Sequence, residues 1–440
     1  MASRSVEPAG LIARLGAFRH RNFTLYWISQ VATNVGTWMM QVATGWLVLE
    51  LTNSPGVLGF NAALQAIPIL TISLVGGVVA DRFDRYRLTV GSQVIQIIPD
   101  AALAWLVMSG QIEVWHVFVY SFVSATINAL SNPARSAWVP NLVPKRDLLS
   151  AMALSSVVWQ GSAVIGPAVA GLILANWGLA GSFNLNVASD FLSLGMLVFI
   201  RLPRMEMTRP AGSGWSNVRE GLLYAWNDRK VRVLLASVGL IMFFARPYAQ
   251  FMPVFARDVF EVGPQGLGLM LTLPAAGTIA AGFALAFAGR VPVVRGFLAT
   301  SAVLAISLIG FCITRNFPLA LGLLFVTGAC SSAATTLANT ALQEVLEERL
   351  RGRVMSLFMA STWGAWRVAS LPLGIMANLW GAPLAVGLSA AALLTALVPT
   401  GRSRALWDVE KVASTPHAPS APPAPTEPAR PNPSEPAPVR

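Results

Sequence analysis

The sequence predicts an all-α membrane protein, with twelve transmembrane helices in two six-helix, pseudo-symmetric halves. Three observations lead to this prediction: long apolar runs recur along the chain, charged residues are scarce, and Lys and Arg gather in alternate loops. Of the 440 residues, 55% are hydrophobic and 12% are charged, whereas a soluble domain carries about 25% charged residues. A β-barrel would instead show ~10-residue segments of alternating polarity, and the sequence has none.

Apolar runs of about 20 residues are long enough to cross the hydrocarbon core as helices. The first six predicted spans lie near 24–50, 54–80, 87–109, 114–138, 149–175 and 182–200. After a polar interval, six more lie near 231–256, 266–289, 293–314, 317–343, 354–379 and 383–400. The chain therefore divides into an N-terminal tail (1–18), a first half (19–200), a linker (201–230), a second half (231–402) and a C-terminal tail (403–440).

The linker and the C-terminal tail differ from the spans in composition. Trp215, Val218, Leu222 and Trp226 recur at helical spacing in the linker. This spacing predicts a short helix that lies on the inner membrane surface. The tail from residue 403 is rich in Pro, Ala and Ser and has little to bury, so we expect it to be disordered.

The positions of Lys and Arg predict the orientation, because cytoplasmic loops carry more of them. With the N-terminus inside, the outer loops hold only Arg257 and Arg315. Both termini are therefore expected in the cytoplasm. The formal charge of +11 then reflects loop placement, and no nucleic-acid partner is expected. Cys312 and Cys330 both lie in apolar runs, so no disulfide is expected.

A weak internal repeat relates the two halves. Residues 54–59 resemble residues 263–268, and Gln41 matches Gln250 at the same separation of 209 residues. Parallel repeats of this kind occur in secondary transporters whose substrate site lies between the halves.

The charged stretch between the second and third spans is the most informative segment. It contains a possible gating latch, made of Gly77, Asp81, Arg82, Asp84 and Arg85. Gly77 lets two helix ends approach closely. Asp81 can favour one conformation if it accepts hydrogen bonds only when the inner gate is closed, and Arg135 is its candidate partner. Alternatively, the cluster is a plain stop-transfer signal and Arg135 an ordinary cytoplasmic anchor.

Four motifs together resemble the major facilitator superfamily, specifically its drug- and siderophore-exporting branch of enterobactin exporters and macrolide efflux proteins. The motifs are residues 77–85, with Asp84 in place of the general glycine; 132–135 followed by 139–144; Gly166-Pro167 with Gly171; and 351–357. The resemblance covers about residues 18–400. It implies the major facilitator fold, a rocker-switch exchange between two open states, and a place in the bacterial inner membrane.

The fifth predicted span carries Gly161, Gly166, Pro167 and Gly171. This set is similar to the antiporter motif of the superfamily, although Gly161 lies one residue further away than the motif requires. The resemblance implies that this helix lines the seam between the halves and favours export over import. Alternatively, these small residues serve generic helix packing.

The resemblance also implies that helices 1, 4, 7 and 10 line a central substrate cavity. Each of them carries polar residues at helical spacing, and a polar stripe inside the membrane must face protein or water. The candidate cavity residues are Asn34, Thr37, Gln41, Asn128, Arg246, Gln250, Asn339 and Arg367. Alternatively, the stripes only supply hydrogen bonds that hold the bundle together, and Arg246 pairs with an acid.

Ionisable residues within the spans are costly in hydrocarbon and therefore point to function. Asp100, Asp190 and Glu50 are the candidates for proton coupling, since a buried carboxylate can carry a proton. Alternatively, Asp100 follows Pro99 and merely caps a broken helix, and Glu50 is a surface residue.

The expected function is secondary active transport, in which a monomer in the lipid bilayer exchanges protons for an amphipathic drug or siderophore. The sequence has no Walker loop, metal-ligand cluster or nucleophile elbow. Neither an enzyme nor a bound cofactor or metal is therefore expected. Two alternatives remain: a proton-coupled importer of a small nutrient, and a non-transporting membrane sensor or scaffold.

Overall fold

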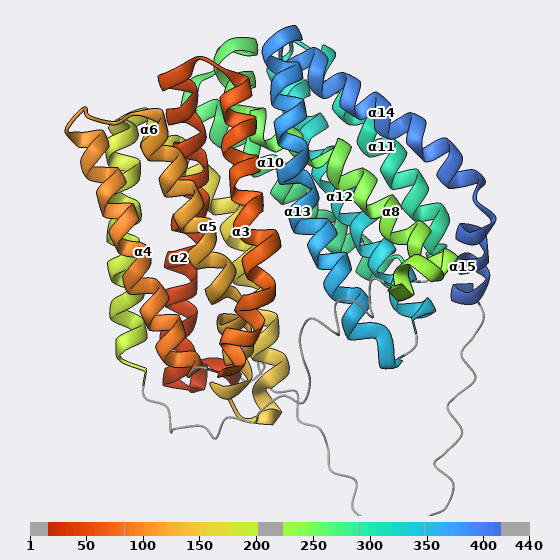
Figure 1. Ribbon diagram of the computed structural model, residues 1–440, viewed down its shortest axis with the longest axis horizontal. Coiled ribbons are helices and arrows are strands. Elements are labelled where there is room, and N and C mark those ends of the chain that lie inside the picture. The colour runs from red at the N-terminus through yellow and green to blue at the C-terminus, as the bar shows by residue number, and fades with distance from the viewer. Residues whose placement is uncertain (1–15, 83, 201–222, 290, 347, 415–440) are drawn as a thin grey trace, which may run out of the picture.

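The computed structural model describes residues 16–82, 84–200, 223–289, 291–346 and 348–414, and the regular elements in these ranges are all helices. They form two helical halves that stand next to each other (Figure 1). The N-terminal half contains η1 (Gly16–Arg19), α2 (Arg21–Thr52), α3 (Pro55–Arg82), α4 (Arg85–Met108), α5 (Val114–Trp138), η2 (Val139–Asn141), η3 (Lys145–Asp147) and α6 (Leu148–Val198).

The C-terminal half begins with a broken helix, made of α8 (Arg229–Phe244), η4 (Arg246–Phe251), α9 (Met252–Val254) and η5 (Phe255–Val259). It continues with α10 (Gly263–Phe287), α11 (Val293–Ile313), α12 (Phe317–Val345), α13 (Glu348–Trp380), α14 (Ala382–Arg402) and α15 (Arg404–Ser414). The all-α, two-half fold predicted from the sequence is therefore confirmed.

Two of the predicted spans occupy a single long element. Gly178 lies inside α6 with φ 65° and ψ −168°, a conformation that glycine adopts readily and other residues do not. It divides α6 into two helices that match the predicted spans 149–175 and 182–200.

Helix length and hydropathy support most of the predicted membrane crossings. Among the described residues, nine helices are long and apolar enough to cross a membrane, with α6 counted once. Helices α2 and α13 are not among those nine, although they have 32 and 33 residues. That all twelve predicted spans cross the bilayer remains a prediction.

Polar side chains cap the N-termini of three of the helices. The Asp84 carboxylate accepts from Arg87 N at 3.0 Å at the start of α4, and Asp228 accepts from Lys230 N at 2.8 Å at the start of α8. Asn316 accepts from Leu319 N at 3.0 Å at the start of α12. These contacts satisfy N–H groups that a helix cannot pair internally.

Small and hydroxylated residues let the helices within each half pack closely. In the N-terminal half, α2 and α6 are joined by the Ser29 and Ser193 hydroxyl groups, 2.8 Å apart. In the C-terminal half, the Ser307 hydroxyl of α11 lies 2.9 Å from the Thr327 hydroxyl of α12. Such contacts replace the hydrophobic driving force that is missing between helices in lipid.

The two halves meet near one end of the bundle at two glycine pairs. Between α3 and α13, a Cβ atom added to Gly59 would lie 3.0 Å from Gly374 Cα. Between α6 and α10, a Cβ atom added to Gly171 would lie 2.8 Å from Gly268 Cα. Only glycine allows two helix backbones to approach this closely. Gly59 and Gly268 hold the same position in the 54–59 and 263–268 repeat, so the internal repeat produces two equivalent contacts.

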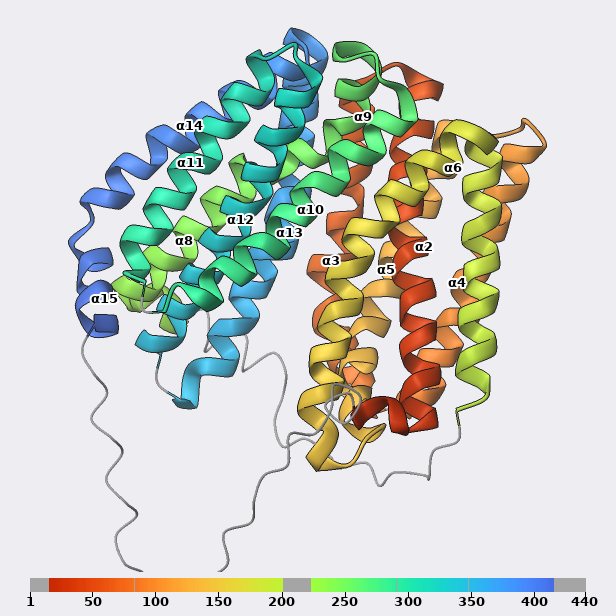
Figure 2. The ribbon, with the colours of Figure 1, turned by 180° about the vertical axis from the view of Figure 1, so that it is seen from behind.

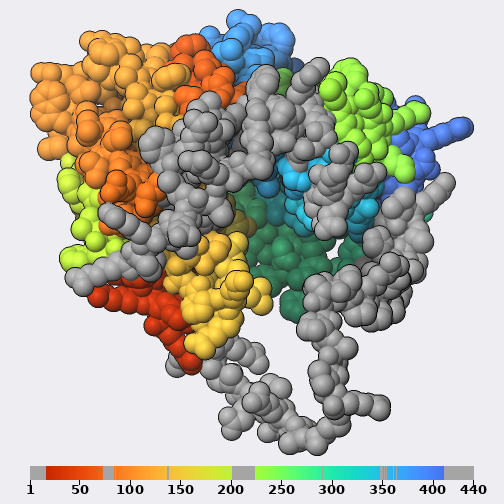
Figure 3. Space-filling model, turned by 60° about the horizontal axis from the view of Figure 1, so that its bottom comes forward, coloured from red at the N-terminus to blue at the C-terminus, as the bar shows by residue number. Residues whose placement is uncertain are grey.

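We call this end of the bundle, which carries the α2–α3 loop, the seam end. The opposite end, which carries α15 and the α3–α4 loop, is the open end. The ribbons of the two halves diverge from the seam end toward the open end (Figures 1 and 2). With the open end turned forward, the surface is hollowed between the halves (Figure 3). The distribution of Lys and Arg predicts that the open end is cytoplasmic.

The start of the C-terminal tail differs from the prediction. Instead of being disordered from residue 403, the chain forms α15, which packs under α8, α11 and α12. Leu406 and Val409 are fully buried there, and the Glu410 carboxylate accepts from Val294 N at 2.6 Å. This 11-residue amphipathic helix escapes a prediction based on the composition of the whole tail. Residues 415–440 lie outside the described ranges.

The linker is described only near its end. Trp215, Val218 and Leu222 lie outside the described residues. Trp226 belongs to a short helical stretch before α8 and is 69% exposed. The Arg232 guanidinium lies 5.9 Å from the Trp226 ring centroid. The interfacial helix in the linker therefore remains a prediction.

Leu406→Ala is expected to release α15 from the open end. Removing a fully buried leucine side chain weakens packing by about 2–5 kcal/mol. The amides of residues 404–414 should then exchange with deuterium at least about tenfold faster, measured by mass spectrometry on the purified protein. Arg404→Gln, at an exposed position of the same helix, should leave exchange unchanged. Equal exchange in both variants would show that α15 does not depend on this contact.

Gly171→Ala is expected to loosen the contact between α6 and α10, because the added methyl group would lie 2.7 Å from the carbonyl oxygen of Pro264. The readout is a single cysteine at Thr37 in a chain from which Cys312 and Cys330 have been removed. A membrane-impermeant thiol reagent added at the seam end should label it at least about threefold faster than in the parent chain.

The matched control for this substitution lies in the same helix. Gly161→Ala adds the same methyl group where no other atom lies within 4 Å, so labelling should not change. If the substitutions at Gly161 and Gly171 change labelling equally, the seam does not control access from that end.

Candidate functional site

One face of α2 contacts the C-terminal half near the seam end. A Cβ atom added to Gly45 would lie 3.3 Å from Pro253 Cγ in α9. Arg257 of η5 donates from Nη1 to the Leu49 carbonyl oxygen at 3.1 Å and to Asn53 Oδ1 at 2.8 Å. These contacts join the first helix of one half to the broken helix of the other.

The same face of α2 is polar further toward the open end. Gln41, Thr37 and Asn34 precede Gly45 in steps of four, four and three residues, which keep side chains on one face of a helix. Thr37 and Gln41 are exposed and Asn34 is half-buried. A face that contacts the other half at the seam end is therefore open and polar at mid-helix.

Arg246 and Gln250 lie on the facing segment of the C-terminal half. They belong to the same broken helix as Pro253 and Arg257, which contact α2, and both are half-buried. We call Asn34, Thr37, Gln41, Arg246 and Gln250 the inter-half polar face. Pro247 and Pro253 have no backbone N–H to donate to a regular helix. The chain forms the 3-10 turn η4 in this region.

Three of the candidate cavity residues make hydrogen bonds within their own helices, and their assignment to a cavity remains a prediction. Asn34 Nδ2 donates to the Gln30 carbonyl oxygen at 2.7 Å, and Thr37 Oγ1 donates to the Thr33 carbonyl oxygen at 2.8 Å. In α12, Gln343 Nε2 donates to Asn339 Oδ1 at 2.8 Å. Each of these bonds stays within its own helix, so these bonds do not hold the bundle together.

Two arginines of the C-terminal half lie near each other. Arg246 in η4 and Arg367 in α13 are both half-buried, and these two elements are in contact. The Arg367 guanidinium also lies 4.4 Å from the ring centroid of Trp366.

The polar stripe of α5 is turned toward α4 more than toward the other half. Ser121 and Ser131 are buried, and Ser124 Oγ accepts from Gln96 Nε2 of α4 at 3.2 Å. Asn128 lies on this stripe, is half-buried, and donates to the Ser124 carbonyl oxygen at 2.9 Å. Its assignment to the substrate cavity remains a prediction.

The two acids predicted in the third and sixth spans come together inside the N-terminal half. Asp100 of α4 and Asp190 of α6 are 2% and 4% exposed, and the two helices pack against each other. Helix α4 continues through Pro99 to Met108. The alternative that Asp100 caps a broken helix is therefore wrong.

Each oxygen of the two acids accepts from a neighbouring side chain. Tyr120 Oη donates to Asp100 Oδ1 at 2.8 Å, and Gln96 Nε2 donates to Asp100 Oδ2 at 2.9 Å. Gln93 Nε2 donates to Asp190 Oδ1 at 3.0 Å, and Asn186 Nδ2 donates to Asp190 Oδ2 at 3.3 Å. The sequence pattern places Gln93, Gln96 and Asp100 on one face of α4, but it does not identify Tyr120.

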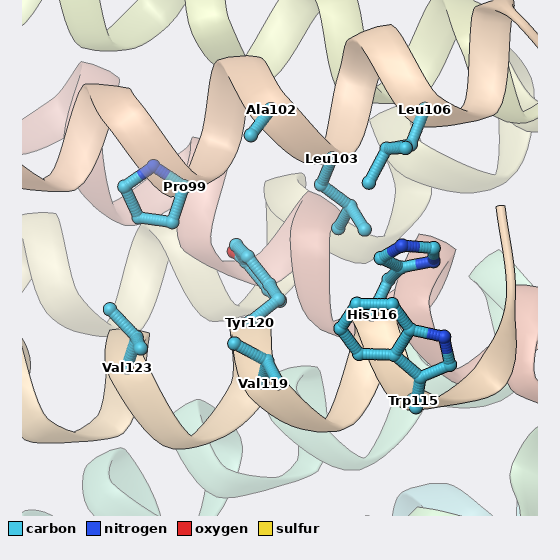
Figure 4. A pocket seen from close by; sticks show the side chains of 9 residues that line it. All are labelled: Pro99, Ala102, Leu103, Leu106, Trp115, His116, Val119, Tyr120 and Val123. Carbon is cyan, nitrogen blue, oxygen red and sulfur yellow. The ribbon is translucent and has the colours of Figure 1, made fainter. Parts of the chain in front are cut away.

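Tyr120 also lines an apolar pocket between α4 and α5 (Figure 4). Its ring points from α5 toward α4, beside Pro99, and the pocket has a volume of ≈ 200 Å³. All its lining residues belong to these two helices of the N-terminal half. The pocket therefore does not join the inter-half polar face.

The structure describes Glu50, the remaining candidate for proton coupling, but only part of the predicted latch. Glu50 is exposed at the seam end and accepts from Trp46 Nε1 at 2.9 Å. The side chains of Gly77, Asp81, Arg82 and Arg85 lie outside the described residues. Asp84 caps α4.

Arg135 makes hydrogen bonds to the neighbouring helices α4 and α2. Its Nη2 donates to Gln93 Oε1 at 2.9 Å, and its carbonyl oxygen accepts from Tyr26 Oη at 3.1 Å. The latch between Asp81 and Arg135 remains a prediction.

The four residues of the fifth-span motif have different surroundings. Gly166 packs on α2, where an added Cβ atom would lie 2.5 Å from Trp38 Cβ, whereas Gly171 lies at the seam. The Pro167 carbonyl oxygen would lie 2.8 Å from a Cβ atom added to Gly268. A Cβ atom added to Gly161 would have no atom within 4 Å apart from the neighbouring backbone of its own helix. The first half of α6 therefore lies at the seam between the halves. The contact also includes the Val164 carbonyl oxygen, between Gly161 and Gly166, which accepts from Thr272 Oγ1 of α10 at 3.1 Å.

Sequence reasoning missed several residues of the site. Arg257 looked like an isolated outer-loop arginine, and its contact with α2 joins residues more than 200 positions apart. Gly268 and Gly374 could be proposed only from the repeat and from the frequency of glycine in membrane helices. Within the described ranges, no three His, Cys, Asp or Glu side chains gather as a metal site requires.

Comparisons with known proteins agree with this arrangement. The chain is 24% identical over 351 residues to the staphyloferrin A transporter of Staphylococcus aureus, covering 79% of this chain and 87% of that protein. It is 26% identical over 375 residues to the multidrug efflux pump Tap of Mycobacterium bovis, covering 81% and 85%. A crystal structure of the peptide transporter POT superposes with a TM-score of 0.71 at 13% identity, covering 89% of this chain and 96% of that one.

The family assignment rests on nearly the whole chain. Residues 12–429 match the sequence profile of the family described as "Transmembrane secretion effector", which is part of the major facilitator superfamily. The relatives are transporters and not enzymes, as the sequence predicted. The chain therefore belongs to the transmembrane secretion effector family of the major facilitator superfamily and is a multi-pass membrane transporter.

Proposed function

We propose that this transporter exports an amphipathic organic molecule from the bacterial cytoplasm by alternating access, in exchange for protons. The observation that carries the proposal is the inter-half polar face. Thr37 and Gln41 are exposed at the middle of α2, and a polar face at this depth must meet water, protein or a ligand. A sensor or scaffold would not need an exposed polar face between the halves at the middle of the membrane.

The contacts between the halves support a rocking motion. The glycine pairs and the Arg257 contacts lie near the seam end, whereas the halves diverge at the open end (Figure 1). If the open end is cytoplasmic, as the Lys and Arg distribution predicts, this conformation receives a molecule from the cytoplasm. Rocking about the middle would part the seam and release the molecule outside.

The charge on the inter-half polar face favours a substrate with an acidic group. Arg246 belongs to this face and is half-buried, and a positive charge within the membrane points to function. The relatives are named as a staphyloferrin A transporter and a multidrug efflux pump, which supports an organic molecule as the cargo. We therefore propose an amphipathic molecule that carries a carboxylate or a comparable anionic group.

The first experiment uses the purified full-length chain in proteoliposomes with a pH-sensitive dye trapped inside. A panel of acidic siderophores and hydrophobic drugs is added against an imposed proton gradient. A compound that dissipates the gradient only when the protein is present establishes coupled transport. Cells that express the chain should then accumulate less of that compound. Higher accumulation would instead support the importer alternative.

Arg246→Gln is expected to raise the half-saturating concentration of an acidic substrate at least about tenfold, since one charge-assisted contact contributes about 1.5–3 kcal/mol. Arg246→Lys should keep most of the affinity. Arg402→Gln, at an exposed position in the last turn of α14, is the matched control and should change nothing. Unchanged affinity in Arg246→Gln would exclude this residue from the substrate site.

A further inference from the structure

We infer that Asp100 and Asp190 form one proton-binding site inside the N-terminal half, in which the two carboxyl groups share a single proton. The inference deepens the proposed function, because it gives the proton a site separate from the substrate. It rests on the proposed function for its role in transport, but the proton site itself can be tested without any substrate.

The first argument is the geometry of the two acids. Both carboxyl groups are buried, and they come from α4 and α6, which pack against each other. Gln93 and Gln96, on one face of α4, donate to Asp190 and Asp100 respectively, so both acids belong to one buried hydrogen-bonded cluster. Two carboxylates in one such cluster cannot both remain ionised without strong repulsion, and burial increases the cost. A shared proton removes the repulsion, because the protonated group donates to the ionised one.

The second argument is the charge balance of the cluster. Among the described residues, the titratable and charged groups that act on the pair are Tyr120 and Arg135, and Tyr26 acts on Arg135. Of these, only Arg135 carries a charge at neutral pH. With one proton on the pair, its single negative charge balances Arg135 and the buried cluster is neutral. With no proton or with two protons, a net charge would remain in a low-dielectric interior.

The third argument is independent of the acids. Ser131 is 2% exposed and its hydroxyl makes no hydrogen bond, and Gln96 Oε1 is also buried without a partner. Ser131 lies on α5 between Ser124, which accepts from Gln96, and Arg135, which donates to Gln93. Its hydroxyl is therefore placed beside the cluster, and buried polar atoms are normally paired. These atoms can accept from the O–H of an arriving water that carries the proton.

The site has a physical connection to the substrate face. Asn186, which donates to Asp190, packs directly against Gly36 of α2, where an added Cβ atom would lie 2.5 Å from Asn186 Oδ1. Gly36 is adjacent to Thr37 of the inter-half polar face. On the other side, Gln93 links Asp190 to Arg135. A change in the protonation of the pair can therefore move α2 and the end of α5 together.

The proton step itself is simple and balanced. A hydronium ion gives up a proton, and one O–H bond forms on the pair. When the proton leaves, that bond breaks and water takes the proton. No oxidation or other reactant is needed.

The test is infrared spectroscopy of the purified full-length protein without substrate, titrated over the neutral pH range. We expect a carboxylic-acid C=O band that corresponds to one protonated group per chain. Asp100→Asn and Asp190→Asn should each remove this band completely, because the single remaining carboxylate then balances the charge of Arg135 without a proton. Glu50→Gln, at an exposed position, should leave it intact. A full band in either aspartate variant, or no band in the parent chain, would overturn the inference.

Tyr120→Phe keeps the inference testable if an aspartate variant fails to fold. It preserves the ring in the pocket but removes the hydroxyl that donates to Asp100 Oδ1. The midpoint of the band's titration should therefore shift. An unchanged midpoint would show that the band does not come from this pair.

The two proposals fail in different ways. If the band is present but no compound is exported, the proton site stands and the proposed substrate class is wrong. If a compound is exported with proton movement but the band is absent, the transport proposal stands and the pair is not the proton site. If both hold, Asp100→Asn and Asp190→Asn should bind substrate within about threefold of the parent chain while proton movement falls at least about tenfold.

Discussion

The close approach of helix backbones at two glycine pairs determines how the two halves are held. Gly59 meets Gly374, and Gly171 meets Gly268, all near the seam end. Helices in lipid lack a hydrophobic driving force toward one another, so small residues that allow backbone contact decide where they associate. Because the closest contacts lie near one end, the other end can separate without breaking the packing inside either half. A pair of rigid bodies joined in this way is suited to rocking.

The polar residues between the halves follow from this arrangement. Thr37 and Gln41 continue the face of α2 that touches the other half at Gly45, so their exposure results from the divergence of the halves. Their counterparts Arg246 and Gln250 sit in a 3-10 turn, where the regular helix is interrupted. Interrupted helices at mid-membrane are tolerated where they line a cavity, because water or a ligand can satisfy the freed backbone groups.

Much of the fold could be predicted because membrane helices carry a strong local signal. The predicted span 114–138 coincides with α5, and the 54–59 repeat locates one glycine of each seam contact. Helix α13 begins at Glu348 instead of near 354, because a helix can continue past the bilayer with charged residues on it. Helix α15 was missed since its few apolar residues, including Leu406, are diluted in a Pro-rich tail. Periodicity assigns a residue to a face but does not identify the neighbouring helix, so the buried cluster that contains both Asp100 and Asp190 was not predictable.

The ionisable groups of the two halves differ, and this asymmetry links the two proposals. The C-terminal half carries Arg246 on the inter-half polar face, whereas the N-terminal half keeps Asp100 and Asp190 buried in a cluster with Arg135. An anionic substrate and a proton would therefore not compete for one carboxylate. They would act on each other through α2, which carries Thr37 on one face and packs against Asn186 through the adjacent Gly36. Coupling of this kind requires that α2 respond to both ligands, since two sites influence each other only through an element whose position both of them change.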